Sequence, residues 1–370
     1  MSGLGERMSA GERVEGSVYM RWAKTRGAAR FDLASSGLAN LPLAELDASL
    51  ADLELSGPSL YGYEPLQRAL AAKCGVAPEC VVAAQGTSGA NHLVMSLLLR
   101  AGDEVLMERP AYDPLTAAAQ FLGATIKTFA RRQEQDWRVD VEELARLVTP
   151  RTRLVVLTNL HNPTSAYADE ASLRAVGELA RRAGARVLVD EVYLDAMFEA
   201  APPSAFHLGA EFVTTNSLTK VYGLSGLRCG WVLVEPALAA RLWRLNDLFG
   251  VIAAHPAERL SCVALAQLPR LAARARALLA ANRATFNAFL AARTDLDCAP
   301  LAHGTVAFPR WLGGDAGRLC ARLAEGYETA VVPGHFFGAP AHFRVGLGGD
   351  PAAFAAGLER LGAALDELGG

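Results

Sequence analysis

Between about residues 80 and 235, short apolar runs alternate with longer stretches of helical period. Two of these runs, Arg153–Leu157 and Arg186–Val189, are apolar almost throughout, which is typical of strands covered on both faces. The stretch between them, Asp169–Ala183, has acidic residues at its start and basic residues at its end, as the helix dipole favours. Strands that alternate with helices of this length predict βαβ units and a mostly parallel sheet.

The pattern changes after Pro236, where Ala/Leu/Arg-rich helical patterns cover about Ala237–Phe249 and Pro256–Arg293. Strand-like pieces follow at Thr305–Phe308, Ala330–Val332 and His342–Val345, and a last helix is expected near Pro351–Leu368. We therefore expect three parts: an N-terminal segment (residues 1–40) that joins a smaller α+β domain (251–370), and a large domain (41–250) between them.

Composition narrows the class of partner. Thirty-six basic against 39 acidic residues leave a net charge of −3, which argues against nucleic acid or an anionic membrane as a partner. No apolar run approaches the ~18 residues of a membrane span, and Met1–Gly16, expected to be a loose tail, lacks the apolar core of a secretory signal. The six cysteines and the histidines show no metal-binding spacing, so we expect reduced thiols, a cytoplasmic location and no metal site.

Polar residues follow two of the expected strands. Gln85–Ala90 comes after a run at Val81 and opens a helix, so its backbone N–H groups and hydroxyls form a candidate phosphate site, although the same pattern also suits an ordinary N-cap. Asn162 lies in an Asn-Pro turn after the strand at Leu154. This turn either holds the amide rigidly toward a ligand oxygen or is simply the exit from a strand.

Asp190 ends another strand, with Tyr193 three residues later. At the carboxyl edge of a sheet such an acid could ligate a metal, take part in catalysis or cap a helix. Lys220 lies among hydroxyls, glycines and apolar residues in the stretch Thr214–Trp231. A desolvated lysine near a second cation has a lowered pKa and acts as an amine nucleophile, while the alternative is a structural ion pair.

These stretches occur in a familiar order. They are Gly86-Thr87-Ser88, Pro110-Ala111-Tyr112, Asn162-Pro163-Thr164, Asp190–Tyr193, Ser217-x-x-Lys220, Arg228-x-Gly230-Trp231, Val332–Gly338 and Phe343–Gly346. From about Ser35 to Arg344 the chain resembles the fold-type I pyridoxal-phosphate enzymes, specifically the class I/II aminotransferases. The resemblance implies a large domain with a mostly parallel seven-stranded sheet sandwiched by helices, a smaller α+β domain, and pyridoxal 5'-phosphate as cofactor.

The resemblance also implies roles for single residues. Lys220 would form the Schiff base with the cofactor and move the substrate α-proton, and a neighbouring Arg228 would help to lower its pKa. Asp190 would pair with the pyridine nitrogen, Asn162 and Tyr193 would contact the phenolic oxygen, and Tyr112 would stack on the ring.

Other residues would hold the charged groups of cofactor and substrate. The phosphate would be held by Gly86, Thr87, Ser88, Ser217 and Arg228. Arg344 would clamp the substrate carboxylate, with Asn162 beside it and with a backbone contact from Gly37.

Three further segments bear on the assembly and the substrate. In related homodimers a tyrosine from the partner subunit reaches the phosphate, and Tyr61 fits that position better than its competitor Tyr63. Ser165 stands where the family has glycine, which puts the local backbone of that turn in question. Residues 246–256 fall where a loop that recognises the second substrate is expected.

The resemblance implies an enzyme that transfers the amino group of an α-amino acid to a 2-oxo acid, as a homodimer acting on small molecules. The same site is able to run elimination, decarboxylation or oxidation, because the cofactor supplies the chemistry and the pocket selects the bond that breaks. A catalytically silent binding module is the remaining alternative. The side chain of the amino acid substrate stays open.

Overall fold

The computed structural model describes residues 14–369, so most of the expected N-terminal tail lies outside the described residues. Its centre is a seven-stranded sheet in the order β2-β8-β7-β6-β5-β3-β4, in which β8 is antiparallel to both neighbours and the other pairs are parallel. The strands are β2 (Val81–Gln85), β3 (Glu104–Arg109), β4 (Thr125–Ala130), β5 (Thr152–Thr158), β6 (Arg186–Asp190), β7 (Phe212–Ser217) and β8 (Cys229–Leu233). The expected mostly parallel, seven-stranded sheet is confirmed.

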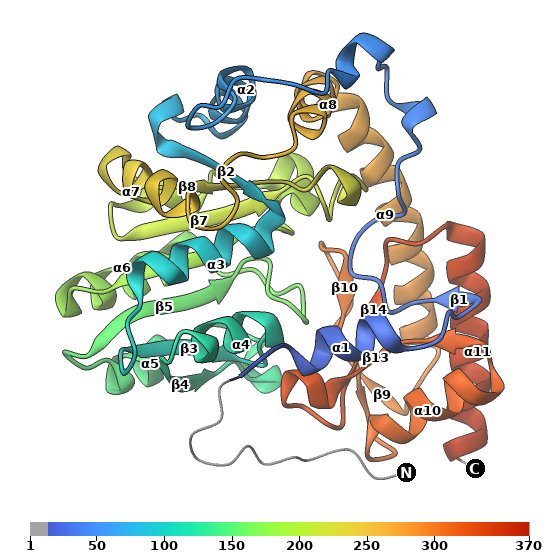
Figure 1. The fold of residues 1–370 in the computed structure, drawn as a ribbon. Helices are drawn as coiled ribbons and strands as arrows, with labels where there is room; N and C mark the ends of the chain where they lie inside the picture. Colours follow the sequence, from blue (N-terminus) through green and yellow to red (C-terminus); the bar gives the residue numbers. More distant parts are fainter. Residues whose placement is uncertain (1–13, 370) are drawn as a thin grey trace.

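Apolar residues on both faces of the strands explain why helices cover the sheet on two sides. Leu154 and Val156 on β5 pack with α3 (Gly86–Leu98), α4 (Asp113–Phe121) and α7 (Pro236–Asn246). Val155 and Leu157, which alternate with them, pack on the opposite face with α5 (Val141–Leu147) and α6 (Glu170–Ala183). Figure 1 shows these two helical layers around the sheet.

Two strands of the central sheet and one of the expected long helices differ from the expectation. The sequence pattern indicated no strand at β4, an edge strand with one buried residue, Phe129, or at β7, whose fully buried residues are mostly polar. The helical pattern from Pro256 to Arg293 is two helices, α8 (His255–Ala266) and α9 (Leu268–Ala291), separated at Gln267. Pro269 explains the break, because its ring excludes a continuous helix through the preceding turn.

A strand pairing joins the described part of the N-terminal segment to the C-terminal third of the chain (Figure 1). β1 (Phe31–Asp32) pairs in parallel with β12 (Thr329–Ala330), although they lie at opposite ends of the chain. This pairing supports our proposal that residues 1–40 belong with residues 251–370. The remaining elements of the described residues are α1 (Val18–Thr25), α2 (Glu64–Cys74), β9 (Leu296–Asp297), β10 (Val306–Ala307), β11 (Arg310–Trp311), α10 (Ala316–Gly326), β13 (Val332–Pro333), β14 (Phe343–Gly346), α11 (Pro351–Gly369) and eight 3-10 helices.

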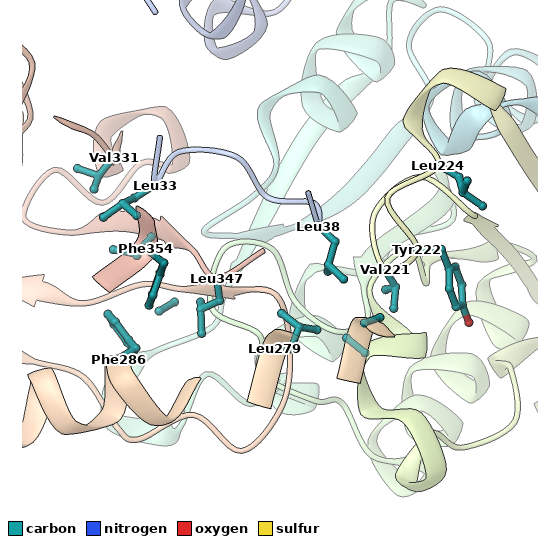
Figure 2. Packing of buried hydrophobic residues seen from close by; sticks show 14 of the residues in the cluster. Leu33, Leu38, Val221, Tyr222, Leu224, Leu279, Phe286, Val331, Leu347 and Phe354 are labelled. Atoms are coloured by element: carbon teal, nitrogen blue, oxygen red, sulfur yellow. The ribbon is translucent and has the colours of Figure 1, made fainter. Parts of the chain in front are cut away.

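One apolar cluster connects the two parts (Figure 2). It brings together Leu38 from the N-terminal segment, Val221 from the loop after β7, Leu279 on α9 and Phe354 on α11. The N–H of Leu38 also donates to the carbonyl of Lys220 at 2.8 Å. The segment that carries Lys220 is therefore held by the core behind it. Within residues 14–369, no helix combines the length and the hydropathy that a membrane span requires.

Candidate active site

A cavity of about 190 Å³ lies at the carboxyl ends of β5, β6 and β7. Its lining includes nine residues that the sequence analysis selected: Thr87, Ser88, Tyr112, Asn162, Asp190, Tyr193, Ser217, Lys220 and Arg228. It also includes five that the sequence analysis did not select: Met20, Asn91, Thr158, Val192 and Thr219. The carboxyl edge of an open α/β sheet is the usual position of a ligand site, so the motifs meet where the predicted topology requires.

The amine of Lys220 lies in this cavity, where its Nζ donates to Ser36 Oγ at 3.1 Å. Burial lowers the pKa of Lys220 to about 8, and the positive charge of Arg344 adds to this effect more than Arg228 does. The carboxylate of Asp190 opposes the shift. A substantial fraction of the amine is therefore neutral near pH 8, as a nucleophile or a proton carrier requires.

Asp190 is buried at the end of β6, and each of its oxygens accepts one hydrogen bond. Asn91 Nδ2 donates to Oδ2 at 2.8 Å, and the N–H of Val192 donates to Oδ1 at 3.1 Å. Burial raises the pKa of Asp190 to about 6, while the two donors act in the opposite direction. The carboxyl group is thus held in a defined orientation but is poised to bind a proton.

A polar cradle lies at the N-terminus of α3. Gly86 has a φ of +68°, and a Cβ there would lie 2.3 Å from Arg228 Nη2. Only glycine lets the guanidinium approach the backbone this closely. Thr87 Oγ1 donates to Ser217 Oγ at 2.9 Å. The hydroxyl of Thr219, which also lines the cavity, is buried and has no hydrogen-bond partner among residues 14–369.

A buried network of hydrogen bonds and one ion pair supports the turn that contains Asn162. Glu108 accepts hydrogen bonds from the N–H and the hydroxyl of Thr158, both at 2.6 Å, and pairs with Arg131 at 2.9 Å. Thr158 Oγ1 in turn accepts from the N–H of Asn162 at 3.0 Å. The turn is therefore connected to a charged pair that is fully removed from solvent.

Ser165 adopts the backbone conformation that the family's glycine would be expected to have in this turn. Its φ is +60°, the left-handed conformation that glycine adopts readily, and its Oγ donates to the carbonyl of Val306 at 2.7 Å. The turn therefore keeps a left-handed backbone at this position, and the serine hydroxyl bonds to β10. Asn162 retains its place in the cavity.

Arg344 lies behind Asn162 and is fully buried rather than exposed at the cavity wall. Its Nη1 donates to Asn162 Oδ1 at 3.0 Å, and its Nη2 donates to Tyr19 Oη at 2.8 Å and to the carbonyl of Ala34 at 3.0 Å. Its Nε has no hydrogen-bond partner in the part of the chain that the structure describes. Gly37 lies against Lys220, since a Cβ at Gly37 would be 3.3 Å from Lys220 Cδ. The carboxylate clamp remains a prediction for both residues.

Tyr61 lies outside this cavity. Its side chain is 53% exposed, and its hydroxyl donates to Asp247 Oδ2 at 3.0 Å. The ring of Tyr63 makes an edge-to-face contact with His255 at 4.9 Å. Residues 246–256 also lie away from the cavity and expose Phe249, so the predicted roles of these segments are not tested within one chain.

The family model described as aminotransferase class I and II matches residues 38–361. The chain belongs to that family. It is therefore a pyridoxal-phosphate-dependent enzyme, and the expected cofactor and the expected aminotransferase activity are confirmed at the level of the family.

Individual relatives cover most of this aminotransferase. Capreomycidine synthase of Streptomyces vinaceus is 32% identical over 333 residues, which are 86% of this chain and 85% of that protein. The arginine–pyruvate transaminase of Pseudomonas aeruginosa is 31% identical over 287 residues, 73% of this chain and 70% of the relative. The crystal structure of a PLP-dependent aminotransferase from Streptococcus suis superposes with a TM-score of 0.89 at 26% identity, covering 95% and 97% of the two chains.

Sequence reasoning missed several polar residues around the reactive groups of this aminotransferase. Asn91 contacts Asp190, Ser36 contacts Lys220, and Tyr19 contacts Arg344. The available signal was strongest for Asn91, a polar residue that interrupts the buried apolar face of α3. Ser36 adjoins Gly37, which the resemblance had selected, so that stretch was the signal for Ser36. No local pattern marks Tyr19, which only the tertiary structure brings to Arg344.

Proposed function

We propose that this aminotransferase transfers the amino group of an α-amino acid to a 2-oxo acid with Lys220 as its amine nucleophile and proton carrier. The single observation that carries this proposal is the position of the Lys220 amine. It lies in the cavity, close enough to Asp190 and Arg344 for their charges to shift its pKa, which is lowered to about 8. Of the four lysines in the chain, only Lys220 lines this cavity.

The residues of the cavity fit pyridoxal phosphate. Within the described residues, the buried Thr219 hydroxyl has no partner, and Arg228 closely approaches Gly86. Both features match what a phosphate needs, namely free donors and a backbone without a Cβ. We propose that Gly86, Thr87, Ser88, Ser217 and Arg228 hold the phosphate, with Thr219 as a further donor. When bound, the cofactor supplies an aldehyde that condenses with amines and a ring that accepts electrons from the substrate Cα.

The other side chains then have separable roles. Asp190 holds the ring nitrogen in its protonated form, Asn162 and Tyr193 contact the phenolic oxygen, and Tyr112 stacks on the ring. Arg344 binds the substrate carboxylate, for which Nε and the groups now bonded to Tyr19 and Asn162 provide the donors. Lys220 takes the proton from the substrate Cα and returns it during transfer.

The test is replacement of Lys220. In K220A, we expect turnover to fall by about 1,000-fold or more, because both the nucleophile and the proton carrier are lost. Reduction of the wild-type complex with borohydride, followed by peptide mass mapping, should locate the cofactor on Lys220. K127A, which removes a lysine outside the cavity, serves as the control. Wild-type turnover in K220A would disprove the proposed mechanism.

A second candidate function is a ring closure or an elimination on an amino acid. The observation that favours ring closure is the likeness to the crystal structure of the PLP-dependent cyclase OrfR, which superposes with a TM-score of 0.86 at 27% identity and covers 99% of this chain. The two functions are separated by mixing the enzyme with single amino acids. Amino transfer consumes a 2-oxo acid in equal amount, whereas elimination or ring closure proceeds without a 2-oxo acid and returns the cofactor unchanged.

We also propose a homodimer located in the cytoplasm. All six cysteines are free thiols, which suits a reducing compartment. The surface around Tyr61 supports the dimer, because several apolar side chains there are exposed: Leu60, Leu248, Phe249, Val251 and Ile252. Tyr61 is the side chain that we propose to reach the phosphate of the partner subunit.

A further inference from the structure

Asn91 on α3 connects two strands beneath the cavity. The hydroxyl of Thr215 on β7 donates to Asn91 Oδ1 at 2.6 Å, and Asn91 Nδ2 donates to Asp190 Oδ2 on β6 at 2.8 Å. Asn91 is 4% exposed, and Thr215 and Asp190 are buried as well. The three side chains form one continuous chain of hydrogen bonds from β7 to the carboxylate.

The neighbours of Asn91 determine which way its amide group points. Its Nδ2 faces a carboxylate, which only accepts hydrogen bonds when it is ionised, and its Oδ1 faces a hydroxyl that is able to donate. A reversed amide would place an oxygen against the ionised carboxylate. The Thr215 hydroxyl therefore fixes Asn91 as a donor to Asp190.

The charge of Asp190 depends on this donor. Around the carboxylate, Lys220 favours the ionised form, whereas Glu108 and burial oppose it. Besides Asn91, the only other donor to Asp190 within the described residues is the N–H of Val192, on the other oxygen. Loss of the Asn91 donor would leave one buried oxygen unpaired, which favours the neutral acid.

We propose that Asn91, locked by Thr215, is a positioning residue that keeps Asp190 ionised and aimed at the ring nitrogen of the cofactor. The proposal rests on the role of Asp190 under the proposed function. A neutral carboxyl at this position holds the ring nitrogen in its protonated form less well, so the ring withdraws electrons less strongly. Asn91 acts through Asp190 and takes no proton itself.

The experiment compares N91L, T215V and T215S with D190N, and uses S96A as the matched control. Ser96 lies on the same helix and bonds to His92 outside the cavity. The first readout is the titration of the Asp190 carboxyl in the full-length chain without cofactor, followed by NMR with ¹³C-labelled aspartate and assigned with D190N. The second readout is kcat and KM of the chain loaded with pyridoxal phosphate.

We expect N91L to raise the titration midpoint of Asp190 by about one unit or more and to lower kcat about 10- to 100-fold at nearly unchanged KM. T215V should change both quantities in the same direction by less, and T215S, which keeps the hydroxyl, should restore them. If N91L does not fold, the pair T215V and T215S decides the question, and an unchanged midpoint in T215V then overturns the proposal.

Two outcomes separate this inference from the proposed function. If D190N is inactive while N91L and T215V titrate and turn over like S96A, Asp190 keeps its role and the assignment of Asn91 is wrong. If D190N itself turns over like the wild type, the proposed role of Asp190 fails, and the assignment of Asn91 fails with it.

Discussion

At the residue scale, Lys220 and Asp190 depart from their ordinary behaviour for the same reason. Burial disfavours the charged form of each, so the pKa of the lysine falls to about 8 and the pKa of the aspartate rises to about 6. The two values are closer together than those of exposed side chains. Each group therefore changes its protonation state within a pH range in which the enzyme can be studied.

This shift predicts how the chain without cofactor combines with pyridoxal phosphate. The rate should rise with pH as Lys220 loses its proton and should level off above about pH 8, because the pKa of Lys220 is lowered to that value. An ordinary lysine would give a rate that increases up to about pH 10. Stopped-flow absorbance across pH 6–11 measures the profile, and K127A should reproduce it. A profile that still rises above pH 9.5 would contradict the expected burial of the amine.

At the scale of an element, the turn from Asn162 to Ser165 shows how a strained residue is retained. A left-handed conformation costs a non-glycine residue on the order of 1 kcal/mol. The hydrogen bond from Ser165 to Val306, 141 residues away, offsets this cost and joins the turn to β10. The turn that positions Asn162 is therefore stabilised from the other part of the molecule.

Removal of the Ser165 hydroxyl tests whether its hydrogen bond offsets the cost of the left-handed backbone. S165A keeps the left-handed strain but loses the hydrogen bond, so the free energy of unfolding should fall by about 1 kcal/mol. S165G loses the same bond but also removes the strain, so it should lie closer to the wild type than S165A does. Urea denaturation of the chain without cofactor measures both. S165A as stable as the wild type would show that the bond to Val306 contributes nothing.

At the scale of the whole molecule, the exposed Tyr61 and its apolar neighbours bear on the proposed homodimer. In a single chain Tyr61 bonds to Asp247 and lies outside the cavity. If Tyr61 serves the partner subunit, each active site draws residues from two chains. Inactive variants with different defects are then able to restore each other.

A mixture of K220A and Y61A chains should recover activity after the subunits exchange. In the mixed dimer, one site combines Lys220 from the Y61A chain with Tyr61 from the K220A chain, so about one quarter of the wild-type activity is expected at limiting cofactor. Y63A in place of Y61A is the matched control. Y63A chains should be active by themselves, so mixing them with K220A chains should give no gain in activity over the separate chains. Recovery with Y63A instead would assign the role to Tyr63, and monomers in sedimentation would contradict the dimer.

Most of the fold was predictable because local patterns carry it. The apolar runs at β5 and β6 and the capped helix between them marked a parallel sheet, and the strand ends marked its carboxyl edge. β7 was not predictable in this way, since four of its six buried residues are polar and two of them, Thr215 and Ser217, bond to α3. Without its hydrogen-bond partners, the polar sequence of β7 looks like that of a loop.

The sequence alone therefore determined the α/β class, the family and the residues that reach the cavity from strand ends, such as Asp190, Asn162 and Lys220. The tertiary structure decided which groups surround them. Asn91 and Ser36 meet Asp190 and Lys220 across 99 and 184 residues of chain. Such contacts depend on how distant elements pack, and no local periodicity records them. The chemistry of a side chain can thus be inferred from its motif, but its protonation state follows only from its neighbours in the folded protein.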